Sequence, residues 1–340
     1  MAKGKRRARP RAERPSAPSK RRAAPAGRPR RPAARPPAVE DIEVTGAMTA
    51  ADLVEQMGLA GGFTAKHVAE ALGVLQAMRG DAASVNFLSF PAALMATGCR
   101  GVMRTLVDTG VFHAVVTTCG TLDHDIARSF APYHPGSFAM DDRELLAAGV
   151  HRLGNVLVPR DSYGPLLEER LRPWFDDLYA RGLRDYTSPE ILREVGMRLP
   201  STSFLATCAA RSVPVFVPGL TDGAFGSQLW MYWQEHRAFR WDPMREEHEL
   251  SDIVFAARRS GALMVGGGIS KHHTLWWNQF KGGLDYGVFV TTASQYDGSL
   301  SGARLEEAIS WGKLKPKARF VTVDGDATVM LPLLAAGLLR

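Results

Sequence analysis

The sequence predicts an α/β fold, in which a mainly parallel sheet carries helices on both faces and a helical extension precedes the first strand. Two observations support this prediction. After residue 84, short apolar segments alternate with segments of helical spacing, which is the pattern of β-α-β units. The apolar segments are continuous and do not alternate with polar residues, as is typical of strands that are covered on both faces.

The extension is expected to contain two helices. Thr49 followed by Asp52 indicates a helix start, and this helix should end near Gly58, with a second helix over 64–78. Strands are expected at 85–90, 114–118, 213–217, 263–265, 287–292 and 320–323. Each is followed by an expected helix, at 95–108, 122–130, 224–234, 271–281, 303–311 and 327–339. Residues 140–212 are expected to be mostly helical.

The basic residues are concentrated at the N-terminus. Residues 1–40 hold 14 of the 42 Lys and Arg residues, eight prolines and only two acidic residues. The remaining 300 residues therefore hold 28 basic and 33 acidic groups, a net charge of −5, although the whole chain carries +7. A segment with so little apolar content is predicted to be a disordered tail with at most weak contacts to RNA. Residues 41–340 are predicted to form a single domain.

The cysteines and the hydropathy pattern favour a cytoplasmic protein. Cys99, Cys119 and Cys208 are widely spaced and odd in number, so they predict neither a disulfide framework nor a zinc site. We expect no metal, because no H-E-x-x-H spacing occurs. We also expect no membrane span, because no apolar run reaches the ~18–20 residues that one needs.

Polar and small residues follow five of the predicted strands, at the edge of the sheet where such folds bind ligands. The triplet Gly266-Gly267-Gly268 can bring backbone amides close to a phosphate, although it is not the G-x-G-x-x-G pattern. Asp326 suits either a ribose hydroxyl or the N-cap of the last helix. His272 and His273 begin a helix, where neighbouring side chains diverge by ~100°, so only one of them can face a given site.

Lys313 lies two residues after Trp311, at the end of a predicted helix. A lysine becomes a nucleophile when burial beside an aromatic wall removes its proton. A lysine near a helix C-terminus is also commonly a surface residue that compensates the helix dipole. The residues alone leave both interpretations open.

Several motifs together resemble the deoxyhypusine synthase family, in order, over about residues 45–340. They are RLGNVLVP (152–159), TDGAFG (221–226), GGGISKHH (266–273), and DGSLSGAR followed by EEAISWGK (297–304 and 306–313). The resemblance implies a Rossmann-like, doubly wound domain that binds NAD and assembles as a homotetramer, with active sites at dimer interfaces. It also implies oxidation of the polyamine spermidine, an imine on a lysine, and transfer of the aminobutyl group to a lysine of translation initiation factor 5A.

The resemblance also assigns residues. Lys313 should be the nucleophile, and His272 should be the acid/base residue. The polyamine should contact Asp297, Gly298, Glu307 and Trp311. NAD should contact Thr117, Thr118, Asp222, Gly266, Gly267, Gly268, Thr292, Ala293, Ser301, Asp326 and Ala327. Carboxylates suit a polyamine, because spermidine is a tri-cation.

The chain departs from the family pattern at the acidic residues that are expected to bind the amine. Leu300 and Ser227 stand where spermidine-using members carry aspartates, and Asp123 and His124 replace two glutamates. Asp123 or Asp125 can replace the two missing aspartates only if its carboxylate reaches the polyamine site. The segment 91–98, PAALMATG, replaces a loop that is usually rich in Ser, Thr and Asn.

Three functions are therefore compared. The first is deoxyhypusine synthesis on the protein factor. The second keeps the chemistry but uses a small-amine acceptor, as in homospermidine synthesis, or a different amine donor. The third is a non-catalytic NAD-binding protein, which the joint presence of Lys313, His272 and Trp311 argues against.

Overall fold

The computed structural model describes residues 37–340, so the predicted tail lies outside the described residues except for its last four. The two helices of the extension are α1 (Ala50–Leu59) and α2 (Phe63–Gly80). The Thr49 hydroxyl accepts from the Asp52 amide, and the Asp52 carboxylate accepts from the Thr49 amide. This reciprocal cap confirms the predicted helix start.

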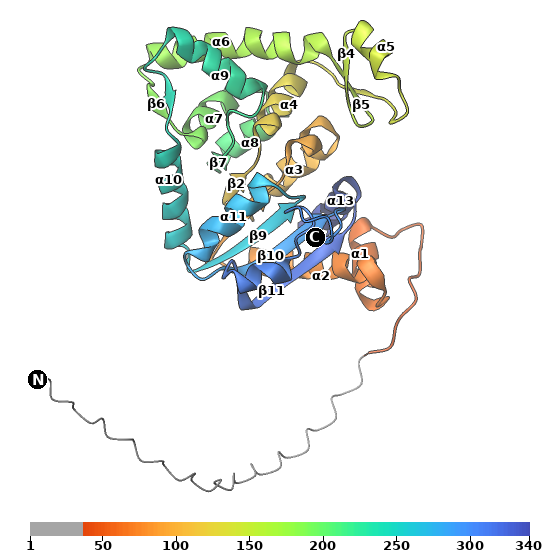
Figure 1. Ribbon diagram of the computed structural model, residues 1–340. Coiled ribbons are helices and arrows are strands. Elements are labelled where there is room, and N and C mark those ends of the chain that lie inside the picture. The colour runs from red at the N-terminus through yellow and green to blue at the C-terminus, as the bar shows by residue number, and fades with distance from the viewer. Residues whose placement is uncertain (1–36) are drawn as a thin grey trace, which may run out of the picture. The chain divides into compact units, whose positions relative to one another are not determined.

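The central sheet has six strands, and every pairing in it is parallel (Figure 1). In chain order they are β1 (Ser84–Ser89), β2 (Ala114–Val116), β7 (Val215–Phe216), β9 (Arg259–Val265), β10 (Leu284–Thr291) and β11 (Leu314–Asp324). Their spatial order is β11-β10-β9-β1-β2-β7. Read from β7, this is the order 3-2-1-4-5-6 of dinucleotide-binding folds, so the predicted doubly wound α/β fold is confirmed.

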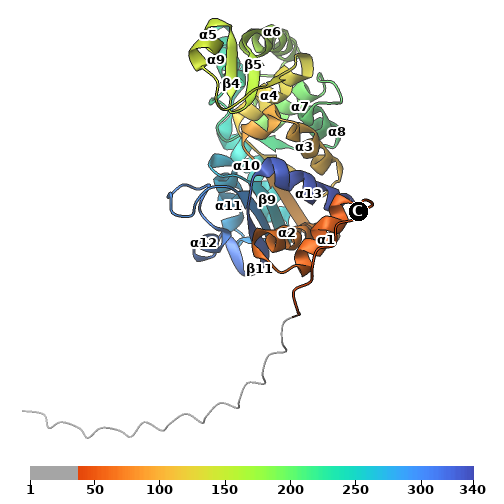
Figure 2. The same ribbon diagram turned by 90° about the vertical axis from the view of Figure 1, so that its right-hand side faces the viewer.

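Helices cover both faces of this sheet, as predicted. Alternate strand residues enter two cores. Leu88, Val115 and Val288 pack with α2 and with α13 (Ala327–Leu339). Phe87, Val116 and Phe289 pack with α10 (Pro243–Ala256), α11 (Ile269–Gln279) and α12 (Leu305–Ser310). Figure 2 shows α2 and α13 on one side of the strands and α11 and α12 on the other. None of the described helices is long and apolar enough to cross a membrane.

The remaining helices follow in chain order. They are α3 (Cys99–Asp108), α4 (Cys119–Phe130), α5 (Asp142–Ala147), α6 (Gly164–Ala180), α7 (Ser188–Gly196), α8 (Phe204–Ala210), α9 (Ala224–Glu235), α10 (Pro243–Ala256), α11 (Ile269–Gln279), α12 (Leu305–Ser310) and α13 (Ala327–Leu339). Two 3₁₀ turns, η1 (Ala92–Ala96) and η2 (Arg160–Ser162), complete them.

The prediction that 140–212 is mostly helical is confirmed, because α5, α6, α7 and α8 cover most of this segment, but it missed the strands there. This region contains an antiparallel hairpin of β4 (Val150–Leu153) and β5 (Val156–Pro159), which β3 (His134–Pro135) extends to three strands. A further strand, β6 (Asp185–Tyr186), pairs with β8 (Arg240–Trp241). The hairpin turns at Gly154-Asn155, where Gly154 has a positive φ of 62°. A glycine-containing pair between apolar segments is a hairpin signal that the helical interpretation overlooked.

Strand β11 begins at Leu314, six residues before the predicted start. Lys313 therefore immediately precedes a strand. Its carbonyl accepts from the Leu284 amide (3.1 Å), and its own amide donates to the Ala308 carbonyl (2.9 Å). The register pairs Leu284 with Leu314 at the amino end of β10, so the backbone of Lys313 is fixed at that edge of the sheet.

Candidate active site

The carboxyl ends of β1 and β9 lie at the point where the strand order reverses. Chain segments leave these two strands toward opposite sides of the sheet, and in such folds this is where dinucleotides bind. The loops after the two strands are close together, because a Cβ built on Gly266 would lie 3.4 Å from the ring of Pro91. The predicted cofactor edge is therefore the switch point of the sheet.

The glycine triplet after β9 is required by its conformation and by its packing. Gly266 and Gly268 have φ angles of 62° and 91°, which disfavour any side chain. A Cβ on Gly267 would lie 2.2 Å from the Cα of Ser301. Gly267 therefore lets the loop after β10 lie directly against the loop after β9.

Two helices present their N-termini at this edge. Thr118 and Gly268 are the N-caps of α4 and α11, and neither cap makes a side-chain hydrogen bond to its helix. The N-terminus of α9 differs, because Asp123 accepts from the amides of Ala224 (2.9 Å) and Phe225 (2.7 Å). Helix N-termini and close-approach glycines flanking a switch point fit the phosphates of a dinucleotide.

The other predicted cofactor residues also follow strand ends. They are Thr117, Thr118, Asp222, Thr292, Ala293, Ser301, Asp326 and Ala327. Three of these side chains have internal partners. The Thr118 hydroxyl accepts from the Ala92 amide (3.1 Å). Thr117 is fully buried and donates to the Phe90 carbonyl (2.8 Å). Asp326 caps α13 by accepting from the Thr328 amide (2.9 Å), so its interpretation as an N-cap is confirmed. The amide of Thr117 also donates to the Phe216 carbonyl (3.0 Å), so neither its side chain nor its amide is free to bind a ligand in the described chain.

Helix α11 separates the two histidines, as predicted. His273 points toward α10 and pairs with Glu247 (Nε2 to Oε2, 3.2 Å). His272 stacks on Trp276, with ring centroids 5.7 Å apart and planes at 27°. Burial, with help from the charge of Lys313 and then of His273, lowers the pKa of His272. His272 is therefore on the same face of the molecule as Lys313 and is mostly neutral at pH 7.

Lys313 lies among aromatic side chains. Its Nζ is 5.3 Å from the ring centroid of Trp311 and 5.5 Å from that of Trp276. The structure thus brings together Lys313, Trp311 and His272, three residues that the sequence singled out. It adds Trp276, which the sequence analysis missed. The available signal was its spacing, because Trp276 is four residues after His272 and lies on the same helix face.

Lys271 is the buried lysine of this region. Its Nζ donates to the carbonyls of Leu300 (2.9 Å) and Ala303 (2.5 Å) and lies 3.5 Å from the ring centroid of Phe289. Burial lowers its pKa to about 8, an effect that the charge of Glu307 opposes. Because its donors face backbone oxygens, Lys271 fixes the loop before α12 and does not face Lys313.

We expect Lys271→Met to change the pH dependence of stability. The folded pKa of about 8 is below the ordinary value of 10.5, so between these pH values the unfolded chain binds more protons. Wild-type stability should therefore rise through this window, by at most about 1.4 kcal/mol per pH unit from this group. Urea unfolding of both proteins from pH 7 to 10 measures the difference. A difference in unfolding free energy that stays constant over this range would contradict a buried, strained ammonium.

The residues that are predicted to bind the polyamine do not all lie in one place. Asp297 and Gly298 are exposed at the tip of the loop between β10 and α12, where Asp297 accepts from the Ser299 amide (2.8 Å). Glu307 lines a cleft of about 600 Å³ beside the edge strand β11, opposite Glu70 of α2. Leu300, in the same loop as Asp297, has an exposed side chain.

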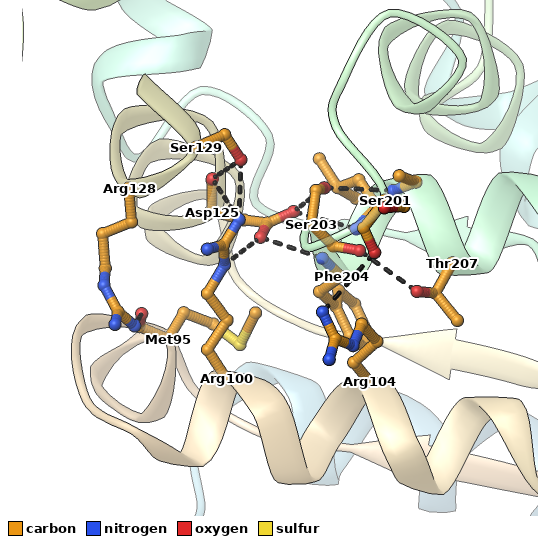
Figure 3. Close-up of polar contacts among 12 residues, drawn as sticks. Met95, Arg100, Arg104, Asp125, Arg128, Ser129, Ser201, Ser203, Phe204 and Thr207 are labelled. Carbon is orange, nitrogen blue, oxygen red and sulfur yellow. Dashed lines mark hydrogen bonds and ion pairs between the residues drawn. The ribbon is translucent and has the colours of Figure 1, made fainter. Parts of the chain in front are cut away.

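Neither Asp123 nor Asp125 replaces the two missing carboxylates. Asp123 caps α9 and accepts from the hydroxyl of Tyr163 (2.8 Å). Asp125 is fully buried and is bound by Arg100 and Ser203, each at 2.6 Å (Figure 3). It also accepts from the amides of Phe204 and Leu205 at the start of α8. Both carboxylates are therefore part of the scaffold.

The Asp125 cluster supports the loop after β1. As Figure 3 shows, Arg128 of α4 lies beside Arg100, and its guanidinium donates to the carbonyls of Met95 (2.7 Å) and Thr97 (2.5 Å). These carbonyls are at the end of η1, the turn that replaces the usual Ser-, Thr- and Asn-rich segment. The conformation of this turn is thus fixed from α4.

Comparison with known proteins gives one consistent result. Residues 52–338 match the family described as deoxyhypusine synthase. A probable deoxyhypusine synthase of Thermoplasma acidophilum is 49% identical over 88% of this chain and 96% of its own, and one from Ignicoccus hospitalis is 51% identical over 88% and 95%. A crystal structure from Entamoeba histolytica that carries the same family name has a TM-score of 0.60 at 18% identity, covering 88% of this chain and 96% of its own, and shows the same fold.

Proposed function

This chain belongs to the deoxyhypusine synthase family, whose members are aminobutyl transferases, and we propose that it transfers the aminobutyl group of spermidine through Lys313 to a lysine of translation initiation factor 5A. The observation that carries the proposal for Lys313 is its environment. Its amine lies between the indoles of Trp311 and Trp276, on the face that holds His272. An amine, an acid/base group and a wall for alkyl cations are what an imine-forming transferase needs.

NAD is the proposed cofactor, and the switch point would hold it. The N-termini of α4 and α11 and the turn Gly266–Gly268 would bind its phosphates. The loops that carry Thr292, Ser301 and Asp326 surround the same edge. When bound, NAD would accept hydride from the carbon next to an amine nitrogen of the substrate.

His272 and Lys313 have distinct proposed roles. Because its lowered pKa keeps it neutral, the imidazole of His272 can accept the N–H proton as the amine is oxidised to an imine. The Nζ of Lys313 then bonds to the imine carbon, and the bond from that carbon to the departing amine breaks. The departing amine takes one Nζ proton and the proton that His272 had accepted, and the imine on Lys313 keeps the other Nζ proton as a cation. Transfer to the acceptor lysine repeats this exchange, and the imine carbon on the acceptor would then take back the hydride held by the cofactor.

The assembly and the location are also proposals. The indole of Trp311 is 71% exposed in the described chain, which supports a site that a second copy covers within a homotetramer. We place the protein in the cytoplasm, with the basic segment 1–40 making at most weak contacts to RNA.

Mass spectrometry tests the function directly. The protein is incubated with NAD and spermidine, and borohydride then reduces any imine to a stable adduct. The expected result is an aminobutyl adduct on the peptide that contains Lys313. A second arm adds either translation initiation factor 5A or putrescine and locates the transferred group. Transfer to putrescine alone would favour the small-amine alternative, and the absence of any adduct would contradict transferase activity.

We expect Leu300→Asp to lower the KM for spermidine at least several-fold. The side chain is exposed, while its backbone oxygen stays bound to Lys271, so the new carboxylate can face the amine without moving the loop. Pairing a partly desolvated ammonium with a carboxylate is typically favourable by a few kcal/mol. Leu300→Asn is the matched neutral control. A higher KM in Leu300→Asp than in Leu300→Asn would mean that another donor is native or that the pocket lies elsewhere.

A further inference from the structure

One face of α11 is left open beside Lys313. Its residues are Ile269, His272, Trp276 and Phe280, which recur at helical spacing, whereas Lys271 and Leu275 point into the core. The aromatic members contact each other in sequence. His272 stacks on Trp276, and Phe280 meets the indole of Trp276 edge-on, with centroids 5.8 Å apart and planes at 90°. The indole is therefore held on both sides along the helix.

Trp276 is partly exposed beside Lys313. The residue is 42% exposed, and the Nζ of Lys313 lies 5.5 Å from the centroid of its ring. Trp311 presents its own ring to the same nitrogen at 5.3 Å. Both distances are within the ~6 Å at which an ammonium is attracted by an indole. The rings of the two tryptophans thus already lie near one amine nitrogen.

This aromatic pair coincides with missing carboxylates. Leu300 is neutral, the Ser227 hydroxyl donates to the Gly223 carbonyl, and both Asp123 and Asp125 are held inside the scaffold. Ring faces are a further kind of group that stabilises an alkyl ammonium, and they also contact its methylene chain.

We propose that Trp276 is a specificity-determining residue of the amine site: its indole, together with that of Trp311, binds the cationic nitrogen and adjoining methylenes of an unbranched alkyl polyamine. This inference rests on the proposed function. The electron-rich ring faces repel carboxylates, so amines that carry an acid group are disfavoured. The protonated imine on Lys313 is itself a cation, so the same two rings hold it during transfer.

The test compares Trp276→Leu and Trp276→Phe with wild type. Spermidine binding is measured by calorimetry in the presence of NAD, and KM and kcat are measured separately. Trp276→Leu should weaken binding about ten-fold and raise KM similarly, because a partly desolvated cation–π contact is lost. Trp276→Phe should recover most of that loss, because it retains a ring face. Binding of NAD should be unchanged in both variants.

A matched control is Trp230→Leu, which removes another exposed indole, on α9. It should leave spermidine binding unchanged. Equal losses in Trp230→Leu and Trp276→Leu, or wild-type binding in Trp276→Leu, would overturn the proposal. The experiments distinguish a failure of the role of Trp276 from a failure of the proposed function. An adduct on Lys313 with unaffected binding in Trp276→Leu refutes only the role of Trp276, whereas a wild-type protein that forms no adduct refutes the proposed function.

Discussion

Replacing Lys313 by Arg is expected to reduce aminobutyl transfer by at least about a hundred-fold, because a guanidinium remains protonated and cannot form an imine. The guanidinium can occupy the place of the Lys313 amine near the rings of Trp276 and Trp311. Its backbone would keep the hydrogen bonds to Leu284 and Ala308. The loss should therefore arise from chemistry and not from misfolding or from weaker binding of NAD.

Turnover, NAD titration and adduct mapping together check this result. Lys315→Arg is the control, because Lys315 is two residues away and its Nζ is bound to Asp285 (2.7 Å). That variant should transfer at nearly the wild-type rate. Near-normal transfer by Lys313→Arg would move the nucleophile elsewhere. Lys271 is a poor substitute, because it is 2% exposed and donates to two carbonyl oxygens.

The largest expected loss of stability is that of Asp125→Ala. The carboxylate of Asp125 is fully buried and accepts from Arg100 (2.6 Å), Ser203 (2.6 Å) and the amides of Phe204 (3.0 Å) and Leu205 (2.8 Å). Removing it leaves the guanidinium of Arg100 buried without its counter-ion. Breaking a buried pair in this way typically costs about 3–5 kcal/mol of unfolding free energy.

Urea unfolding at pH 7 measures this cost. Asp142→Ala is the matched control, since Asp142 is also bound by an arginine, Arg152, but its side chain is 64% exposed. An exposed pair contributes only about 0–1 kcal/mol. If Asp125→Ala does not accumulate as folded protein, Asp125→Asn gives a smaller loss that can be measured. Equal stability in the Asp125 and Asp142 variants would show that the cluster does not hold α3, α4 and α8 together.

The sequence predicted most of the fold because its strands are buried on both faces. Continuous apolar segments such as Leu263–Val265 mark the middle of each strand clearly. The ends were harder to place. Strand β11 begins at Leu314 and includes charged residues because one of its edges is exposed. Helix α10 was not predicted, although Asp242 caps it and Pro243 occupies its first turn.

The site was predicted in part. His272 and Lys313 are 41 positions apart in the sequence. The family motifs, and not hydrophobic periodicity, predicted that they belong to the same site. Trp276 escaped notice because an aromatic residue on a helix usually packs in a core. Whether Glu307 faces the amine or the cleft beside β11 depends on the rotation of α12, a helix of only six residues that local spacing does not orient.

The fixed backbone of Lys313 limits how far an aminobutyl group attached to its amine could move. Both its amide and its carbonyl are hydrogen-bonded, and β11 begins at the next residue. The backbone of Lys313 is thus fixed, and only rotations about the bonds of its four methylenes can move a group attached to its amine. In the proposed reaction, the donor and the acceptor would therefore bind in turn within one lysine side-chain length of the Lys313 backbone. A protein acceptor would meet this requirement most easily with its lysine at the tip of a protruding loop.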